Sequence, residues 1–259
     1  MALMLTAVDL AFGYRGVRVG GGVNLAIAPG EVFCLLGPNG CGKTTLFRTL
    51  LGLLPPHAGR VELDGKPVAA FSRAEFARRI AYVPQAGAPT FPFSVADVVL
   101  MGRASRIATF AAPGPADHAA ARAALATIGI AHLAERRFSE VSGGERQMTL
   151  IARALAQEPG LVVMDEPTAS LDFGNQARVI AQVRALGARG IAVVLSTHDP
   201  GQAFACASRV ALMRRGEIVS LGRPTATLKP EALRALYGVD VTVAWLEPAG
   251  RRVCIPTLE

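Results

Sequence analysis

Uninterrupted apolar runs mark the places along the chain where buried strands are expected. Residues 32–36, 80–83, 161–164 and 191–196 are apolar at almost every position. Such runs are typical of parallel strands that are covered on both faces, because a strand with one solvent-exposed face alternates between apolar and polar residues. Helical stretches lie between them, at 45–53 and 174–188. Strands that alternate with helices predict an α/β fold built around a parallel sheet.

The middle of the chain lacks strand-like runs. Ser94 and Asp97 are expected to cap a helix over 95–102, and a helix over 116–128 is expected to stop at Gly129. A further helix is expected to open at Ser142 and run to residue 157. We therefore interpret residues 86–157 as a helical insert. Residues 1–85 and 158–240 then form the α/β core.

Shorter strands are expected near both ends of the chain. Residues 3–10 and 23–28 are expected to flank a loop that holds Tyr14, and the Gly20–Gly22 run makes the neighbouring stretch looser than a usual strand. A hairpin is expected across the turn Arg215–Gly216. After a last helix over 230–237, a second hairpin is expected, so residues 241–259 are interpreted as a C-terminal hairpin extension.

A glycine-rich turn lies between the first apolar run and a helix, which is the context that a phosphate-binding loop requires. Glycines let backbone N–H groups wrap a polyphosphate, and the helix N-terminus adds partial positive charge. Lys43 could reach the β- and γ-phosphates, and Thr44 could offer its hydroxyl to Mg²⁺. A chance match is the alternative, which the strand and helix context disfavours. The turn consists of Gly37, Pro38, Asn39, Gly40, Cys41, Gly42, Lys43 and Thr44, and Thr45 follows it.

Polar side chains follow the other predicted strands at their C-terminal ends, where ligands of a parallel sheet bind. They are Gln85, the pair Asp165 and Glu166, and His198. Beside a phosphate loop, Asp165 is expected to hold Mg²⁺ and Glu166 to polarise an attacking water. Taken alone, the acidic pair would be interpreted as a solvated loop start, and His198 as a surface or cap residue.

Composition narrows the class of protein. Of the 259 residues, 51% are hydrophobic and 18% are charged, which suits one large or two small folded domains. Four cysteines without a C-x-x-C pair disfavour a disulfide framework or a zinc site and fit a reducing cytosol. The net charge of +7 could attract nucleic acid or an anionic membrane, but the arginines are dispersed, which favours an ordinary basic surface. The pattern of the first residues is not the one expected of a signal peptide, and the sequence contains no apolar run of the length expected to span a membrane.

These motifs resemble, in kind and order, those of the ATP-binding subunit of ATP-binding cassette (ABC) transporters, over about residues 1–240. The phosphate loop is similar to the Walker A motif, and residues 161–165 to the Walker B motif, with Glu166 as its catalytic glutamate. Residues 141–145 resemble the signature motif LSGGQ, with Val141 and Glu145 in place of Leu and Gln. The other similar positions are Tyr14 (adenine stacking), Gln85 (Q-loop), Ser142, Gly143 and Gly144 (signature), Asp172 (D-loop) and His198 (switch histidine).

The resemblance implies a P-loop NTPase core with an antiparallel β subdomain and a helical subdomain that carries the signature. It implies a head-to-tail homodimer in which each ATP lies between the phosphate loop of one subunit and the signature of the other. Thr44, Gln85 and Asp165 would hold Mg²⁺, and Lys43 and His198 would stabilise the γ-phosphate. The implied partners are permease subunits and, indirectly, a substrate-binding protein, with no nucleic acid. The resemblance also implies that the chain lies at the cytoplasmic face of the inner or plasma membrane, attached peripherally through the permease.

Two stretches narrow the resemblance further. Residues 94–103 and 164–176 look like the ATPases of importers for iron-siderophores, haem, cobalamin and molybdate, and residues 106–113 are somewhat similar to molybdate or tungstate members. The alternatives are a cytosolic ABC-type ATPase acting on nucleic acid or ribosomes, an exporter ATPase, and a small-molecule kinase. A single cassette without a long coiled coil disfavours the first, and the signature motif disfavours the last. In the insert, Phe91, Phe93, Val98 and Val99 are expected to form part of a permease docking surface or, alternatively, the insert's own core.

Overall fold

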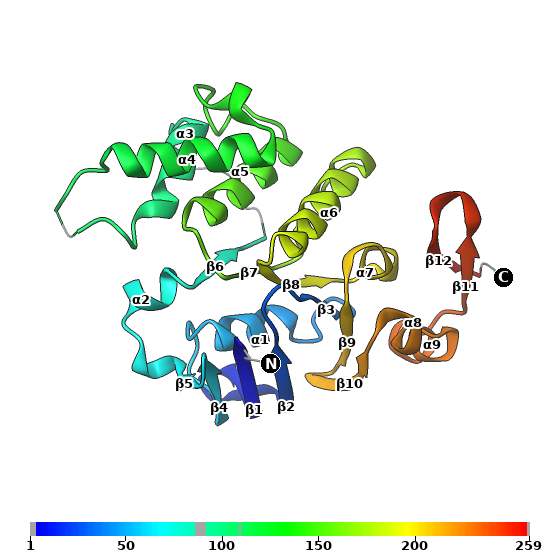
Figure 1. The fold of residues 1–259 in the computed structure, drawn as a ribbon. Helices are drawn as coiled ribbons and strands as arrows, with labels where there is room; N and C mark the ends of the chain where they lie inside the picture. The colour runs from blue at the N-terminus through cyan, green and yellow to red at the C-terminus, as the bar shows by residue number, and fades with distance from the viewer. Residues whose placement is uncertain (1–3, 86–91, 109, 258–259) are drawn as a thin grey trace. The chain divides into compact units, whose positions relative to one another are not determined.

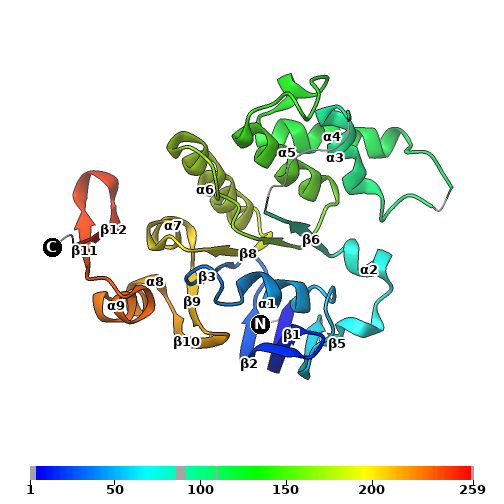
Figure 2. The same ribbon diagram turned by 180° about the vertical axis from the view of Figure 1, so that it is seen from behind.

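The computed structural model describes residues 4–85, 92–108 and 110–257 (Figures 1 and 2). The chain divides into two compact units. Met1–Ala70 and Val183–Glu259 form the first, here called unit 1, and Phe71–Gln182 form the second, unit 2. Within the described residues, the helices are too short or too polar to cross a membrane.

An antiparallel sheet opens unit 1. β1 (Leu5–Tyr14) lies between β2 (Val17–Ile27) and β4 (Ala58–Leu63), and the short β5 (Lys66–Pro67) pairs with β4. The expectation of a loop around Tyr14 is wrong, because β1 continues to Tyr14 and pairs there with Val17. Phe12 explains the longer strand: its side chain is fully buried, and its backbone lies opposite Gly20.

A parallel sheet forms the rest of the unit 1 core. β3 (Val32–Leu36) runs parallel to β8 (Ala192–Thr197) on one side and to β9 (Arg209–Arg214) on the other. Every residue of β3 and β8 is buried, which confirms the prediction from their apolar runs. β10 (Glu217–Gly222) pairs antiparallel with β9, which confirms the expected hairpin. α1 (Lys43–Leu50) starts at the end of the phosphate loop and ends earlier than expected.

The short helices after β8 are not expected from the hydrophobic pattern. α7 (Pro200–Cys206) begins at Asp199, whose carboxylate accepts the N–H of Gly201 at 2.7 Å. α8 (Pro224–Thr227) also begins with proline. Proline in the first turn and an aspartate cap are helix-start signals, but so few residues show no helical periodicity. α9 (Pro230–Tyr237) lies where the sequence predicts the last helix.

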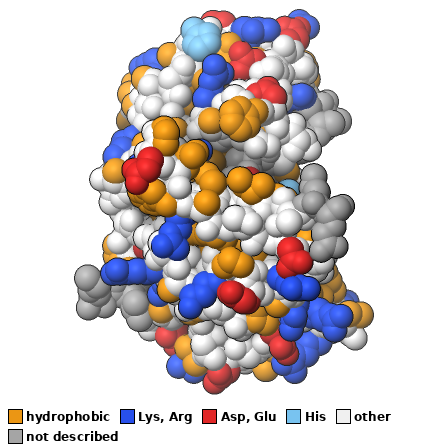
Figure 3. Space-filling view, turned by 90° about the vertical axis from the view of Figure 1, so that its right-hand side faces the viewer, with side chains coloured by type: hydrophobic (Ala, Val, Ile, Leu, Met, Phe, Trp, Pro, Cys, Tyr) orange, Lys and Arg blue, Asp and Glu red, His pale blue; other side chains and the backbone are white. Residues whose placement is uncertain are grey.

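A hairpin follows α9, as the sequence pattern predicts. β11 (Val241–Leu246) pairs with β12 (Arg251–Pro256), and β12 contacts α7. These strands lie on the right of Figure 1, the side that faces the viewer in Figure 3, where hydrophobic side chains gather among charged ones. The exposed apolar side chains of this hairpin include Trp245, Leu246 and Ile255.

Unit 2 contains a parallel strand pair and a group of helices. β6 (Ile80–Val83) pairs with β7 (Leu161–Met164), and both are almost fully buried. The helices are α2 (Arg73–Ala77), α3 (Val95–Leu100), α4 (Pro115–Ile128), α5 (Gly143–Ala156) and the start of α6 (Phe173–Ala188). In the described part of residues 86–157 the chain forms helices and turns, with one isolated bridge between Ser94 and Arg137.

Serine capping boxes fix where three of these helices begin. Ser72, Ser94 and Ser142 each accept the backbone N–H three residues on, and the carboxylate at that position accepts the N–H of the serine. Each reciprocal pair satisfies two N–H groups that the helix itself leaves unpaired. α4 ends at Gly129, whose φ of 82° is the left-handed conformation that glycine adopts without strain.

Candidate nucleotide site

The phosphate loop joins β3 to α1 in unit 1. Gly40 and Gly42 have φ values of 78° and 108°, in the region that favours glycine. The Lys43 ammonium is buried against the loop, where Nζ donates to the carbonyls of Gly37 at 2.8 Å and Pro38 at 3.1 Å. The loop therefore places a cation and the N-terminus of α1 at one point, which favours binding of an anion.

The loop begins beside the end of β8. The Gly37 N–H donates to the Thr197 carbonyl at 3.2 Å, and an added Cβ at Gly37 would lie 2.4 Å from the Met213 carbonyl oxygen. His198 follows Thr197 and is exposed, and its carbonyl accepts the Tyr237 hydroxyl at 2.8 Å. The fold of unit 1 thus brings the first residue of the loop to the strand end that carries His198.

Tyr14 lies at the end of β1, close to the start of α1. Its side chain is 44% exposed, and its hydroxyl accepts a hydrogen bond from the Thr45 hydroxyl at 3.4 Å. Thr45 is buried and Thr44 is half-buried. The bond to α1 fixes the tyrosine next to the phosphate loop, and the exposed ring is available for stacking on a flat ligand.

The predicted metal and base residues lie together in unit 2. β6 and β7 are parallel neighbours with Val83 opposite Met164, and the Asp165 N–H continues the ladder by donating to the Val83 carbonyl at 2.9 Å. Gln85 therefore follows β6 at the edge where Asp165 follows β7. Asp165 is only 3% exposed, and the Tyr82 hydroxyl lies 3.5 Å from its Oδ2. This contact contributes to the orientation of the carboxylate.

Glu166 has an unusual backbone conformation. Its φ is 44°, in the left-handed region where a residue with a side chain pays about 1–2 kcal/mol. Ser170, in the same loop, has a φ of 61°. Strained residues of this kind cluster at functional sites, where the surrounding structure holds them in place. The half-buried Glu166 side chain is thus held by a backbone that the loop enforces.

The signature segment forms the first turn of α5. The Ser142 hydroxyl accepts the Glu145 N–H at 3.3 Å, and the Glu145 carboxylate accepts the Ser142 N–H at 2.7 Å. The hydrogen bonds that the carboxylate accepts from Ser142, from its N–H first and then from its hydroxyl, lower the pKa of Glu145. The glutamate that replaces the usual glutamine therefore serves as the capping partner of Ser142. Gly143 is half-buried and Gly144 is buried.

Asn175 connects the D-loop residue Asp172 with Gly144 of the signature segment. Its backbone N–H and its side-chain amide donate to the Asp172 carboxylate at 2.8 and 2.7 Å, which lowers the pKa of Asp172. Its side chain also covers Gly144, because a Cβ added there would lie 2.1 Å from the Asn175 Cγ. Sequence reasoning missed Asn175. The only signal was its position three residues after Asp172, where the aspartate can cap the helix.

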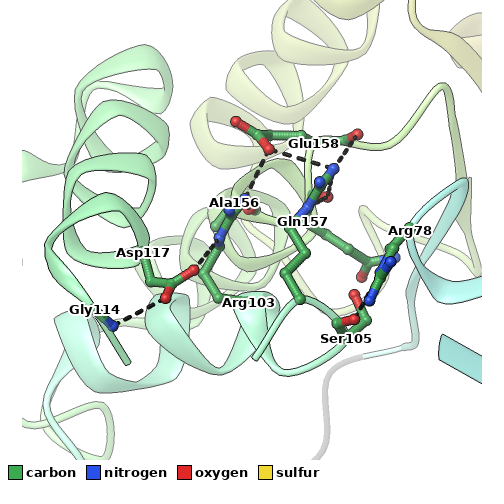
Figure 4. Close-up of polar contacts among 9 residues, drawn as sticks. Arg78, Arg103, Ser105, Gly114, Asp117, Ala156, Gln157 and Glu158 are labelled. Atoms are coloured by element: carbon green, nitrogen blue, oxygen red, sulfur yellow. Dashed lines mark hydrogen bonds and ion pairs between the residues drawn. The ribbon is translucent and has the colours of Figure 1, made fainter. Parts of the chain in front are cut away.

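A polar cluster fixes the other end of α5 (Figure 4). The buried Arg103 donates from Nε to Asp117 at 3.0 Å, and from Nη1 to the Ala156 carbonyl and to Glu158, both at 2.8 Å. The Gln157 side-chain amide donates to the first carbonyl of β6 at 2.7 Å. α5 is thus tied to α4 and β6 at its last turn, while its first turn presents Ser142.

Replacing Arg103 by methionine should destabilise the protein by about 2 kcal/mol, because a buried carbonyl loses its donor. Arg103 also lowers the pKa of both Asp117 and Glu158, so the part of its stabilising effect that comes from these carboxylates is complete above their ordinary pKa values and is lost as the pH falls through the lowered ones. Urea unfolding at neutral and acidic pH measures both effects. Arg137→Met is the control, since Arg137 and its partner Glu140 are largely exposed and should matter little. Equal losses in the two variants would contradict the assignment.

Comparison with known proteins places these features in a family. The ABC transporter family matches residues 21–169. An uncharacterized ABC transporter ATP-binding protein of Haemophilus influenzae is 44% identical over 235 residues, which cover 91% of this chain and 89% of that protein. The hemin import ATP-binding protein HmuV of Nocardia farcinica is 42% identical, with 90% of this chain and 81% of that protein covered.

A solved structure has the same fold. It is a chain of an inward-facing ABC transporter assigned to the metal-chelate type, with a TM-score of 0.88 and 34% identity over 99% of this chain and 98% of that one. The predicted α/β cassette fold is therefore confirmed. The phosphate loop, the ends of β6 and β7 and the capped signature helix lie within residues 21–169, and the chain belongs to the ABC transporter family as a nucleotide-binding ATPase subunit.

Proposed function

We propose that this ATPase powers the import of a metal chelate (haem, an iron-siderophore or cobalamin), or of molybdate or tungstate, through a membrane permease. The observation that carries the proposal is the 42% identity to a hemin import subunit over most of both chains. ABC importer ATPases work with permease subunits, and we place this chain on them at the cytoplasmic face of the membrane. A substrate-binding protein would deliver the cargo on the other side.

Reconstitution with a candidate permease tests the proposal. ATP-dependent uptake into proteoliposomes would be measured for hemin, a ferric siderophore, cobalamin and molybdate, each supplied with the cognate binding protein. We expect one metal chelate to accumulate and to stimulate ATP hydrolysis. The Lys43→Ala subunit, whose loop lacks its cation, is the control and should give no uptake. Transport outward, or no stimulation by any of the four, would contradict an importer.

In the proposed site, each ATP is held by two identical subunits arranged head to tail. The backbone N–H groups of residues 37–44 and the Lys43 ammonium bind the phosphates. Tyr14 stacks on adenine, and His198 stabilises the γ-phosphate. Ser142 and the glycines after it approach the same phosphates from the partner subunit. The exposure of the Tyr14 ring and of His198 supports these roles.

Catalysis in this proposal consists of positioning a water and stabilising charge. Glu166 accepts the proton of the attacking water, which a carboxylate at the end of a buried strand is suited to do. Asp172 acts at the contact between subunits, and Asn175 holds its carboxylate.

The division of the chain at residues 86, 158 and 241 into core, helical subdomain and extension stays a prediction.

The proposed magnesium ligands have the right chemistry. The Thr44 hydroxyl, the Gln85 amide and the Asp165 carboxylate are oxygen donors, which Mg²⁺ prefers, and Mg²⁺ commonly takes its other ligands from substrate phosphates and water. When bound, the ion would neutralise charge on the phosphate oxygens. The Tyr82 hydroxyl, 3.5 Å from Asp165 Oδ2, would help to orient that carboxylate.

A groove in unit 2 suits the proposed permease contact. Its volume is about 320 Å³, and it is lined by Phe93, Asp97, Leu100, Met101, Ala104, Ile107 and Pro113. Phe93 and Met101 are each 43% exposed. Val98 and Val99 are buried, so for these two residues the alternative of an internal core is correct. Phe91 lies outside the described residues.

Charged substitutions in this groove should weaken permease binding while basal ATPase activity survives. Phe93→Asp and Met101→Asp each place a carboxylate on the apolar lining. Docking would remove water from that charged group, and the free-energy cost of this desolvation opposes binding. Co-purification with the permease measures the effect. Phe110→Asp is the matched control, because Phe110 is fully exposed and is not among the lining residues. Undiminished co-purification of both groove variants would refute the docking assignment.

A further inference from the structure

The turn between β9 and β10 touches two parts of the proposed nucleotide site. The Gly216 N–H donates to the Cys41 carbonyl of the phosphate loop at 2.9 Å. The Gly216 carbonyl accepts the Gly21 N–H of β2 at 3.2 Å. Arg215 and Gly216 have φ values of 49° and 82°, so they form the tight two-residue hairpin turn in which glycine is favoured. One peptide segment thus bonds to the phosphate loop and to the first sheet.

Glycine on both sides makes this approach possible. An added Cβ at Gly20 would lie 2.1 Å from the Gly216 carbonyl oxygen and 2.5 Å from the Phe12 ring. An added Cβ at Gly216 would lie 2.0 Å from the Val19 carbonyl oxygen. These distances are well inside van der Waals contact, and the backbone atoms involved cannot rotate away. The first two glycines of the run that looks loose for a strand therefore meet the turn, Gly20 by close packing and Gly21 by its hydrogen bond.

β2 connects this turn to the tyrosine of the site. β2 pairs with β1 along its length, with Gly20 opposite Phe12 and Val17 opposite Tyr14. At the far end of this pair, the Tyr14 hydroxyl is bonded to Thr45 of α1. The hairpin that carries Tyr14 is therefore joined to the loop and helix at two separate points. The Gly216 turn is one of them, and the contact between Tyr14 and Thr45 is the other.

We propose that the Arg215–Gly216 turn is a positioning element for ATP, which holds the phosphate loop and the Tyr14 hairpin in one fixed relation. Donors bind a ligand more tightly when their direction is set before the ligand arrives. Gly20, Gly21 and Gly216 act through the loop and the hairpin and are not assigned to contact the nucleotide. This inference rests on the proposed roles of residues 37–44 and Tyr14.

Substitutions at the contact should weaken binding of the phosphates and of the base together. For Gly20→Ala and Gly216→Ala we expect the Kd for ATP and for inorganic tripolyphosphate to rise about tenfold, as loss of a hydrogen bond and of preorganisation would give. Tyr14→Ala should weaken ATP alone. In a double-mutant cycle, Tyr14→Ala should cost less ATP affinity in the Gly20→Ala background, because the ring is no longer held in place over the loop.

Two glycines supply matched controls. Gly65 occupies the same place in the turn Asp64–Gly65, with a φ of 75°, and an added Cβ meets nothing within 4 Å. Gly22 of β2 has a φ of 67° and is equally open. Gly65→Ala and Gly22→Ala therefore strain the backbone without disturbing the contact. They should lower the melting temperature and leave both Kd values unchanged, which separates positioning from stability.

The outcomes distinguish this inference from the proposed function. If wild-type protein binds ATP and tripolyphosphate, and folded Gly20→Ala and Gly216→Ala bind them equally well, the positioning role is refuted. An effect on melting temperature alone would refute it too. If the wild-type protein binds neither ligand, the assignment of the nucleotide site fails instead. Should Gly216→Ala not fold, Gly20→Ala carries the test, because Gly20 does not have a left-handed backbone.

Discussion

Replacing Glu166 by glutamine is expected to lower ATP turnover by about a hundredfold or more, the usual order for loss of a catalytic base. Glutamine keeps the size of the side chain and its place after β7, but its amide cannot take a proton from the attacking water. ATP binding should stay intact, and an ATP-bound dimer should accumulate. Single-turnover ADP formation measures the chemistry, while a binding titration and size-exclusion chromatography measure the other two effects.

Glu145→Gln is the matched control for this prediction. It is the same chemical change within the same unit, at a residue whose carboxylate accepts the Ser142 N–H. A glutamine can accept that N–H equally well in a capping box, so turnover should stay close to that of the wild type. Near-normal turnover in Glu166→Gln would remove Glu166 from the catalytic role.

Mixing two inactive subunits should restore ADP formation if each site joins two chains. Lys43→Ala removes the cation that the phosphate loop holds, and Ser142→Arg blocks the N-terminus of α5 in the signature. Each variant should be inactive as a homodimer. In a mixed dimer, one site combines both defects, whereas the other combines an intact loop with an intact signature. That intact site should form ADP, and the nucleotide should be bound to the phosphate loop of the Ser142→Arg subunit.

The subunit-mixing experiment requires proof of subunit exchange and an assay of single turnover. Two different affinity tags first establish that subunits exchange, and single turnover is the assay, since steady turnover can require both sites. Arg137→Met mixed with Lys43→Ala is a control, because the exposed Arg137 leaves the signature intact. Exchanged dimers of the two inactive variants that form no ADP would favour a site built within one chain.

Local signals in the sequence were sufficient for most of the fold. The apolar runs of β3 and β8 and the serine caps of α3 and α5 each depend on residues close together in the chain. The predicted end of β1 was wrong, because that strand is extended by the burial of Phe12, whose ring lies close to Gly42 of the phosphate loop, thirty residues further along the chain. α7 was missed because its aspartate cap is a short signal without periodicity behind it.

Contacts of the candidate site that join distant segments could not be predicted in the same way. The motifs place Lys43 in the loop between β3 and α1, and Asp165 and Glu166 after the end of β7, by their spacing alone. Nothing in that spacing shows that Asn175 covers Gly144, or that Gly216 reaches the carbonyl of Cys41. Both depend on how closely two backbones approach, and a glycine in a sequence does not reveal which neighbour requires it.

The left-handed backbone of Glu166 lowers the stability of the fold at a residue whose side chain the proposed reaction requires. Glycine adopts this conformation without strain, and asparagine adopts it more readily than glutamate. Selection for stability alone would therefore favour glycine or asparagine at position 166. Either residue would abolish the proposed reaction. A glutamate at this position is then a mark of selection for turnover. Ancestral reconstruction or thermostability engineering that scores only folding would tend to erase it.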